Sequence, residues 1–236
     1  MKVSAVVPAH NEEGNLPKLV PALKRALSKL DYEIVLVDDN SKDSTPKLCD
    51  KFARDKQVRC IHRTSNPGMG AALKEGTKAA SGEAVVWVMG DLSDDLDTIP
   101  KFVKKIECGA DVVFGSRYMP GGNPGDLETT KMFASSGFSR IAKILFQLNV
   151  HDITNAFRGF RKSAFDSLKI DSNDFGISPE FALKAKKAGF RLDEVPTGYK
   201  RRKAGKATFK MGRMGLKYGK IMLAVLFTPK SRIKAQ

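Results

Sequence analysis

Residues 85–99 read VVWVMGDLSDDLDTI, and this stretch decides how the chain folds. It begins as an unbroken apolar run at 85–88 and ends in a segment that carries Asp91, Asp94, Asp95 and Asp97. A short continuous apolar run is typical of a strand that is buried on both faces. The aspartates have two interpretations, because a strand tip with carboxylates can hold a metal ion and the same residues can start a helix.

The composition is that of a globular protein of one large or two small domains. The chain has 236 residues, of which 42% are hydrophobic. Its three cysteines show no CxxC spacing, which predicts neither a disulfide framework nor a zinc site and suits a reducing compartment. The opening MKVSAVVPAHNEE has no cleavage-like region and is predicted to be a first strand. No apolar run approaches the roughly 20 residues of a membrane-spanning helix.

The positive charge is concentrated at the C-terminal end. The formal net charge is +15, and residues 200–236 contain 12 Lys or Arg and no Asp or Glu. Such a segment suits nucleic acid, an anionic membrane surface or a phosphorylated substrate. Its apolar run 221–227 is flanked by lysine and arginine, which favours a helix at a lipid interface or against a partner. Packing against the sheet is the alternative.

Apolar strands alternate with helical patterns in the first half of the chain. Strands are predicted at 3–7, 33–37, 58–61, 84–88 and 111–115, and helices at about 13–29, 71–80 and from Asp94 or Asp97 to 107. This alternation predicts an α/β protein with a mostly parallel sheet and helices on both faces. Ligands of such sheets bind at the carboxyl ends of the strands. Three of these ends carry acids, which favours a nucleotide with a metal ion.

From Pro120 the pattern changes. A flexible loop is predicted at 121–125, and the segments that follow are a helix at about 130–148, a strand or turn at 155–161, a helix at 179–188 and a strand at 192–195.

Six motifs occur in order along the chain: VVPAHNEEGNL, IVLVDDNSKDST, NPGMGAALKEG, GDLSDD, GSRYMPGG and TNAFRGFRK. In these motifs the chain resembles the inverting family 2 glycosyltransferases with the GT-A fold, which is a Rossmann-like α/β fold. It is most similar to the polyprenyl-phosphate glycosyltransferases, the group of dolichol-phosphate mannose synthase. The resemblance implies a catalytic domain at 1–199, with a nucleotide-sugar half at 1–119 and an acceptor half at 120–199. A basic, amphipathic, membrane-interfacial segment would follow at 200–236.

The resemblance also implies roles for individual residues. The nucleotide sugar would be bound by Pro8, His10, Glu12, Val37, Asp39, Gly70, Gly90 and Asp91. The acceptor phosphate would be bound by Arg117, Lys131, Ser135, Arg202 and Lys206. The residues implied in catalysis are Asp91, Arg117 and Arg202.

One departure from the family pattern concerns the opening stretch. The family has Asp-x-Asp at the end of the fourth strand, and this chain has Met89-Gly90-Asp91. A thioether is a poor ligand for Mg²⁺, which prefers oxygen. Asp91 would therefore share Mg²⁺ or Mn²⁺ with Ser93, the donor diphosphate and water, or with Asp39. Weaker metal affinity follows, and metal-independent action is left open. A second departure is Ala207-Thr208 in place of Ser-Lys, with Lys206 as the substitute phosphate contact.

The function implied is the inverting transfer of a hexose from a GDP-mannose or UDP-glucose type donor to dolichyl or undecaprenyl phosphate. An acceptor phosphate is already anionic, so it needs positioning by arginine rather than a general base. The enzyme would act as a peripheral protein on the cytosolic face of a membrane. The sequence leaves open whether a membrane-spanning partner subunit takes part.

The sequence allows other interpretations. A glycosyltransferase of the same fold with a soluble, protein or polysaccharide acceptor would need a base, for which Glu180 is the candidate; its other role is a charge near a helix start. Asp94 and Asp97 are expected to cap a helix, and His62 and His151 to be surface residues. A receiver-like protein is disfavoured because the acidic pair follows the second strand. Nucleic acid is not expected as a partner, because few aromatic residues accompany the basic tail.

Overall fold

The computed structural model describes residues 1–65, 67–200 and 211–235 of the 236-residue chain. Arg202 and Lys206, which were assigned to the acceptor phosphate, lie outside the described residues.

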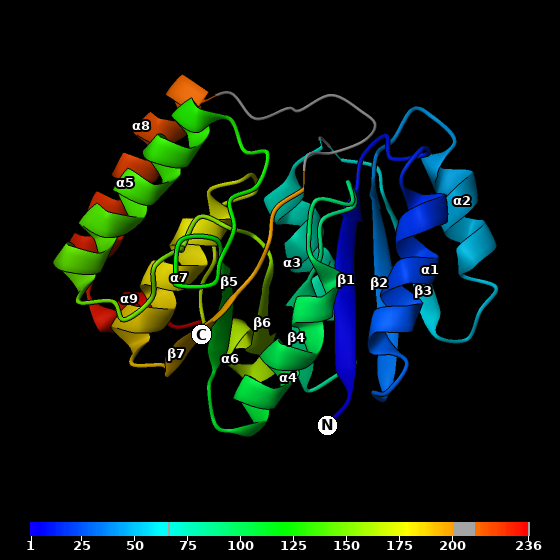
Figure 1. Ribbon diagram of the computed structural model, residues 1–236, viewed down its shortest axis with the longest axis horizontal. Helices are drawn as coiled ribbons and strands as arrows, with labels where there is room; N and C mark the ends of the chain where they lie inside the picture. Colours follow the sequence, from blue (N-terminus) through cyan, green and yellow to red (C-terminus); the bar gives the residue numbers. More distant parts are fainter. Residues whose placement is uncertain (66, 201–210, 236) are drawn as a thin grey trace.

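A seven-stranded mixed sheet forms the centre of the molecule (Figure 1). Its strands, in order across the sheet, are β3 (Val58–Arg63), β2 (Tyr32–Asp39), β1 (Val3–Ala9), β4 (Ala84–Trp87), β6 (Arg158–Arg161), β5 (Val112–Ser116) and β7 (Leu192–Pro196). β6 is antiparallel to both of its neighbours, and the other pairs are parallel. The prediction of a mostly parallel sheet is confirmed, and the segment left as strand or turn is an antiparallel strand.

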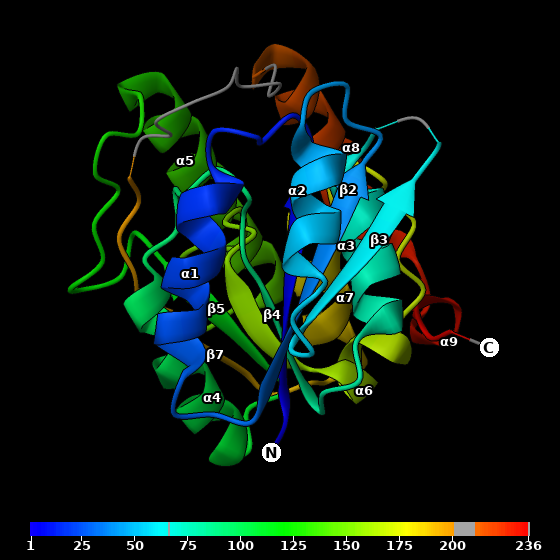
Figure 2. The ribbon, with the colours of Figure 1, turned by 90° about the vertical axis from the view of Figure 1, so that its right-hand side faces the viewer.

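Helices cover both faces of the sheet. One face carries α1 (Leu16–Leu27), α2 (Thr45–Phe52) and α4 (Ile99–Glu107), and the other carries α3 (Met69–Ala79), α6 (Lys162–Asp166) and α7 (Ile177–Ala188). Viewed from the β3 edge, α1 and α3 lie on opposite sides of the sheet (Figure 2). Strand residues alternate between the two cores, so Trp87 packs against Phe160, Phe165 and Phe181 on the α7 side.

Two further helices form an outer layer. α5 (Thr129–Phe146) and α8 (Met211–Phe227) pack against each other and against α7, and the short α9 (Lys230–Ile233) also contacts α7 (Figure 1). Among the α8 side chains that the structure describes, Met214, Tyr218 and Val225 are buried. The apolar run 221–227 therefore lies on a helix that covers other helices, and α7 separates most of it from the sheet.

The close approach of α3 to the sheet depends on Gly76. A Cβ atom at this position would lie 2.8 Å from Val37 Cγ2 and closer still to Val6 Cγ1. Both valines are fully buried in the sheet, so neither can move aside without disturbing its neighbours.

We expect Gly76→Ala to lower the free energy of unfolding by about 1–3 kcal/mol, because the added methyl group overpacks this contact. Denaturant unfolding measures the change. The matched control is Gly137→Ala in α5, where a Cβ would meet nothing within 4 Å. This control should gain about 0.5–1 kcal/mol from helix propensity. A Gly76→Ala variant as stable as this control would contradict the packing described here.

Candidate functional site

A cleft of about 930 Å³ lies at the carboxyl ends of β1, β2, β4 and β5 and is closed on its far side by α5 and α8. Most of the residues implied by the sequence line it: Pro8, His10, Glu12, Asp39, Gly90, Asp91, Ser93, Arg117, Lys131 and Ser135. Two do not. The Val37 side chain is fully buried in the sheet, and Gly70 packs against the backbone of 173–174. The fold therefore brings together side chains that are more than 100 residues apart in the sequence.

The loop after β1 is fastened to the loop after β2. The ring of His10 donates from Nδ1 to the carbonyl oxygen of Asp39 over 2.7 Å. The backbone N–H of Glu12 donates to the Thr45 hydroxyl over 2.8 Å, and its carboxylate accepts a bond from Asn15 at 2.6 Å. Asn11 between them has a left-handed φ of 56°. These bonds hold the two loops together on one wall of the cleft.

Asp39 at the tip of β2 is almost fully buried and already paired. Its carboxylate contacts the guanidinium of Arg63 and accepts the backbone N–H of Gly68 at 2.6 Å. Arg63 in turn donates from Nε to Glu75 over 3.0 Å. Asp39 therefore ties β2, β3 and the start of α3 together at the edge of the cleft.

The end of β4 places two carboxylates on one wall. Asp91 Oδ1 accepts the backbone N–H of Ser93 at 3.1 Å. Asp94 Oδ2 accepts the backbone N–H of Met89 at 2.7 Å, and both aspartates line the cleft. Leu92 has a positive φ of 62°, so the chain folds back between them. The carboxylate of Asp94 thus lies beside position 89, where the family pattern has its first aspartate.

The expectation that Asp94 and Asp97 cap the following helix is therefore wrong, because the N-cap residues are Asp95 and Thr98. A 3-10 turn at Leu96–Thr98 precedes α4, and Asp97 lies in the first turn of this 3-10 helix. Asp94 turns away from it because the Met89 amide holds its carboxylate. Burial, together with the charge of Asp91, raises the pKa of Asp94 to about 8. The two acids lie three residues apart in one loop and line the same cleft.

Arg117 follows β5 and forms a buried ion pair that the sequence did not reveal. Its Nε and Nη2 donate to the two carboxylate oxygens of Asp152 over 2.7 Å and 3.1 Å, and Nη2 also donates to Thr154. Burial disfavours the charged guanidinium, but Asp152 outweighs it and holds the pKa of Arg117 above its ordinary value. Arg117 therefore brings oriented N–H groups to the cleft with its charge largely balanced.

Lys131 and Ser135 reach the cleft from α5. The Ser135 hydroxyl donates to the Lys131 carbonyl oxygen over 2.7 Å and contacts the Tyr118 hydroxyl. The Lys131 ammonium lies 3.0 Å from Glu128 in an exposed pair. Such a pair is weak in water, so an anion in the cleft could displace it.

Glu180 is a structural residue in this fold. It is buried at the start of α7, where its carboxylate accepts backbone N–H groups of 171 and 172 over 2.9 Å and 2.7 Å and pairs with Lys184 at 2.6 Å. It does not line the cleft. This placement favours Glu180 as a charged residue near the start of α7 and disfavours it as a catalytic base.

Oxygen donors gather on the β4 side of the cleft. Asp91, Ser93 and Asp94 offer two carboxylates and a hydroxyl within one short loop. This donor set suits the hard cations Mg²⁺ and Mn²⁺, which take carboxylate oxygen and water.

The architecture is that of the GT-A class of glycosyltransferases. Solved structures of glucosyl-3-phosphoglycerate synthase from Mycobacterium tuberculosis share the fold, although the sequences are only 16% identical. The complex with Mn²⁺, uridine-diphosphate and phosphoglyceric acid has a TM-score of 0.73 and matches 98% of this chain and 80% of its own. The complex with Mg²⁺ and uridine-diphosphate has a TM-score of 0.74, with 98% and 81% covered.

The chain belongs to glycosyl transferase family 2, whose family model matches residues 4–169. The expected resemblance is therefore confirmed. It is 32% identical to dolichol-phosphate mannosyltransferase of Pyrococcus furiosus, over 89% of this chain and 60% of that protein. It is 28% identical to polyprenol monophosphomannose synthase of Mycolicibacterium smegmatis, over 90% and 86%. It is 29% identical to undecaprenyl-phosphate mannosyltransferase of Micrococcus luteus, over 91% and 90%. The chain thus spans less than two thirds of the Pyrococcus relative and most of the other two.

We expect Asp152→Asn to cost about 3–5 kcal/mol of stability, because it leaves the Arg117 guanidinium buried without its counter-charge. The control is Asp166→Asn, which breaks the more exposed Lys162–Asp166 pair at 2.6 Å and should change stability by less than about 1 kcal/mol. Chemical denaturation of both variants makes the comparison. Equal effects would contradict the importance of the buried pair.

The stability difference between the wild type and Asp152→Asn should depend on pH. Burial opposes ionisation of Asp152, but Arg117 holds the pKa of the carboxyl below its ordinary 3.8. The contribution of the pair is therefore complete above pH 3.8 and declines as the pH falls below it. The stability gap between the wild type and Asp152→Asn should narrow in that acid range.

Proposed function

We propose that this protein transfers a hexose from a nucleotide sugar to a polyprenyl phosphate, with inversion at the anomeric carbon. One observation carries the proposal: an acid-lined cleft at the strand tips is closed by two helices whose outer faces are apolar and basic. Three relatives are named as mannosyltransferases or mannose synthases of dolichol phosphate, polyprenol phosphate or undecaprenyl phosphate. Their names support this acceptor, and they make a mannosyl nucleotide the first candidate for the donor. A UDP-glucose type donor is the second candidate.

The nucleotide diphosphate would lie along the β1, β2 and β4 tips. Pro8, His10, Glu12, Asp39 and Gly90 form the wall that would receive the base and ribose. A Cβ at residue 90 would lie 2.7 Å from the Pro8 carbonyl oxygen, so only glycine lets the β4 tip approach β1 this closely.

Asp91, Ser93 and Asp94 would hold a divalent ion, Mg²⁺ or Mn²⁺, against the diphosphate. When bound, the ion supplies positive charge to the leaving group. Asp94 would take the place of the family's first aspartate, because the Met89 amide fixes its carboxylate beside that position. The ions in the structures of the M. tuberculosis synthase support a divalent metal in this fold.

The acceptor phosphate would be positioned by donors on the opposite wall. Arg117 offers N–H groups held in one orientation by Asp152, and Lys131 and Ser135 approach from α5. Arg202 and Lys206 are proposed to complete this group. Because a phosphate oxygen is already a nucleophile at neutral pH, these residues orient it and no side chain has to remove a proton.

The outer faces of α5 and α8 would lie against a membrane. In the part of the chain that the structure describes, every exposed large hydrophobic side chain is on one of these helices: Phe133, Ile141, Ile144, Leu145, Leu216, Leu223 and Phe227. Neither helix contains Asp or Glu, and both contain lysine. Such a face suits the interface of an anionic membrane and would place a lipid-borne phosphate at the cleft. The protein would thus work peripherally at a cytosolic membrane face.

Among the described residues, no helix has the length and apolar character that crossing a bilayer requires.

The function is tested with the purified chain, Mn²⁺ or Mg²⁺, a panel of labelled nucleotide sugars and a polyprenyl phosphate. We expect label to enter the organic phase with one donor, and only when the lipid phosphate is present. Transfer exclusively to a water-soluble acceptor would contradict the proposal and favour the soluble-acceptor alternative.

Metal binding at the β4 tip is tested by Asp91→Asn and Asp94→Asn. We expect each to weaken Mn²⁺-dependent binding of the nucleoside diphosphate at least about tenfold, since even outer-shell partners of a metal contribute that much. Calorimetry with and without Mn²⁺ measures it independently of turnover. Asp95→Asn is the control, because this neighbour does not line the cleft. If Asp94→Asn behaved like Asp95→Asn, Asp94 would not be a ligand.

Membrane association is tested by Ile144→Glu and Phe227→Glu, whose side chains are each 78% exposed. Each should reduce sedimentation with anionic liposomes at least about tenfold, because burying such a side chain contributes about 1.5–3 kcal/mol. Nucleotide binding should not change. Gln57→Glu adds the same charge at the opposite edge of the sheet, beside β3, and should have no effect. Equal liposome binding by all three variants would exclude α5 and α8 as the membrane face.

A further inference from the structure

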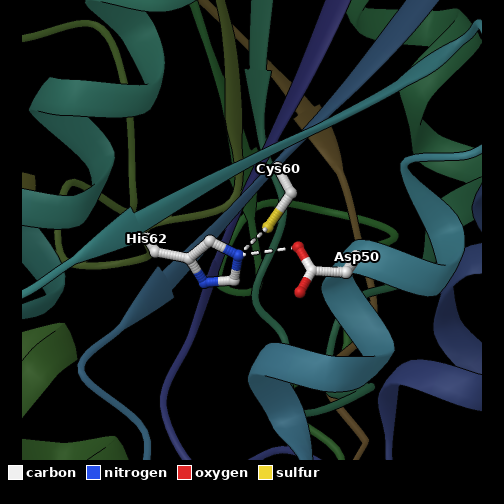
Figure 3. Close-up of side chains that lie close together, drawn as sticks. All are labelled: Asp50, Cys60 and His62. Atoms are coloured by element: carbon white, nitrogen blue, oxygen red, sulfur yellow. Dashed lines mark hydrogen bonds and ion pairs between the residues drawn. The ribbon is translucent and has the colours of Figure 1, made fainter.

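A second group of ligand-type side chains lies far from the cleft-closing helices, between α2 and the edge strand β3 (Figure 3). Cys60 and His62 are two residues apart on β3 and so point to the same face, and Asp50 approaches from α2. His62 Nε2 lies 2.9 Å from Asp50 Oδ1 and 3.4 Å from Cys60 Sγ. All three ligand atoms are within 4.8 Å of one another.

These separations are close to those of a zinc site. With bonds of about 2.0–2.3 Å at tetrahedral angles, zinc would hold the nitrogen about 3.4 Å from the oxygen and about 3.6 Å from the sulfur. The two distances from His62 Nε2 would have to lengthen by only a few tenths of an ångström. The Asp50 side chain, 69% exposed, can supply most of that movement.

Both less mobile ligands have an outer partner of the right kind. Asp38 Oδ2 lies 3.0 Å from His62 Nδ1, which directs the Nδ1 proton to Asp38 and leaves Nε2 as the coordinating atom. The buried thiol of Cys49 lies beside Cys60. Carboxylate–histidine pairs of this kind are characteristic of metal sites.

The negative charges of Asp38 and Asp50 also favour a cation at this group. Both ring nitrogens of His62 face carboxylates, so Asp50 and Nε2 can come together only with a proton or a metal ion between them. Thiolate and imidazole favour zinc over magnesium or manganese, so this group would select a different ion from the oxygen donors of the cleft.

We propose that Asp50, Cys60 and His62 form a zinc site that joins α2 to β3, with a fourth position open to water. Its outer partner Asp38 also accepts the backbone N–H of Ser41 at 3.2 Å. The Ser41 hydroxyl in turn accepts the N–H of Asn11 at 3.0 Å, in the loop beside the cleft. Zinc would thereby stiffen the nucleotide-binding edge without contacting the substrate.

The test uses the tag-free full-length chain, freed of metal and kept reduced so that Cys49 and Cys60 stay thiols. Titration with Co²⁺ should produce a sulfur-to-cobalt charge-transfer band that saturates near one equivalent and is abolished by adding Zn²⁺. Cys60→Ser should lose the band, and His62→Gln should weaken binding at least about tenfold. Cys108→Ser is the matched control, because this exposed cysteine lies outside the group, and it should keep the band.

Two further variants separate this site from its surroundings. Asp91→Asn should leave the band and its affinity unchanged, since that residue belongs to the cleft. Cys49→Ala should keep the band but weaken Zn²⁺ binding about 10- to 100-fold, as expected for an outer partner. Circular dichroism establishes that each variant is folded. A wild-type protein with no sulfur band, or a folded Cys60→Ser variant with an unchanged band, would overturn the proposal.

Discussion

The parallel pairing of β1 with β2 and β4 determines where the cleft forms. It places the carboxyl ends of these strands, with Asp39 at the end of β2 and Asp91 after β4, at one edge of the sheet. Carboxylates gathered in this way repel one another unless positive groups or amide N–H groups meet them. Arg63 meets Asp39, and Arg117 meets Asp152. At the β4 tip, backbone amides of residues 89 and 93 hold the two aspartates. Both of these aspartates line the cleft.

The second half of the chain gives this edge its other wall. β6 inserts antiparallel between β4 and β5, and α5 and α8 then cover α7 and close the cleft. The same two helices carry inward residues that pack, such as Tyr218 against Phe138 with ring centres 5.3 Å apart, and outward residues that stay exposed. One pair of helices can therefore serve both the acceptor wall and a membrane face.

Much of the fold could be predicted from the sequence, because buried parallel strands are apolar throughout and each is followed by a helical pattern. The short strand Arg158–Arg161 was ambiguous, since two of its four residues are arginines and its pairing is set by distant neighbours. Site residues that directly follow strands, such as Asp91 and Arg117, were found for the same reason that the strands were.

Partners supplied from elsewhere in the chain could not be predicted. Asp152 has no local signal, because its importance comes from Arg117, 35 residues away. Asp94 was assigned to a helix start, because the bond to the Met89 amide depends on the left-handed turn at Leu92. The cysteine spacing likewise gave no sign of the group formed by Asp50, Cys60 and His62. These residues come together only because α2 packs on the edge strand β3.

The central claim is that the two aspartates at the β4 tip hold a cation against the donor diphosphate. A crystal structure with Mn²⁺ and the nucleoside diphosphate of the active donor, read by manganese anomalous scattering, tests it most directly. We expect one manganese peak bonded to carboxylate oxygens of Asp91 and Asp94 and to the diphosphate. A peak elsewhere, or a diphosphate bound away from this wall, would contradict it.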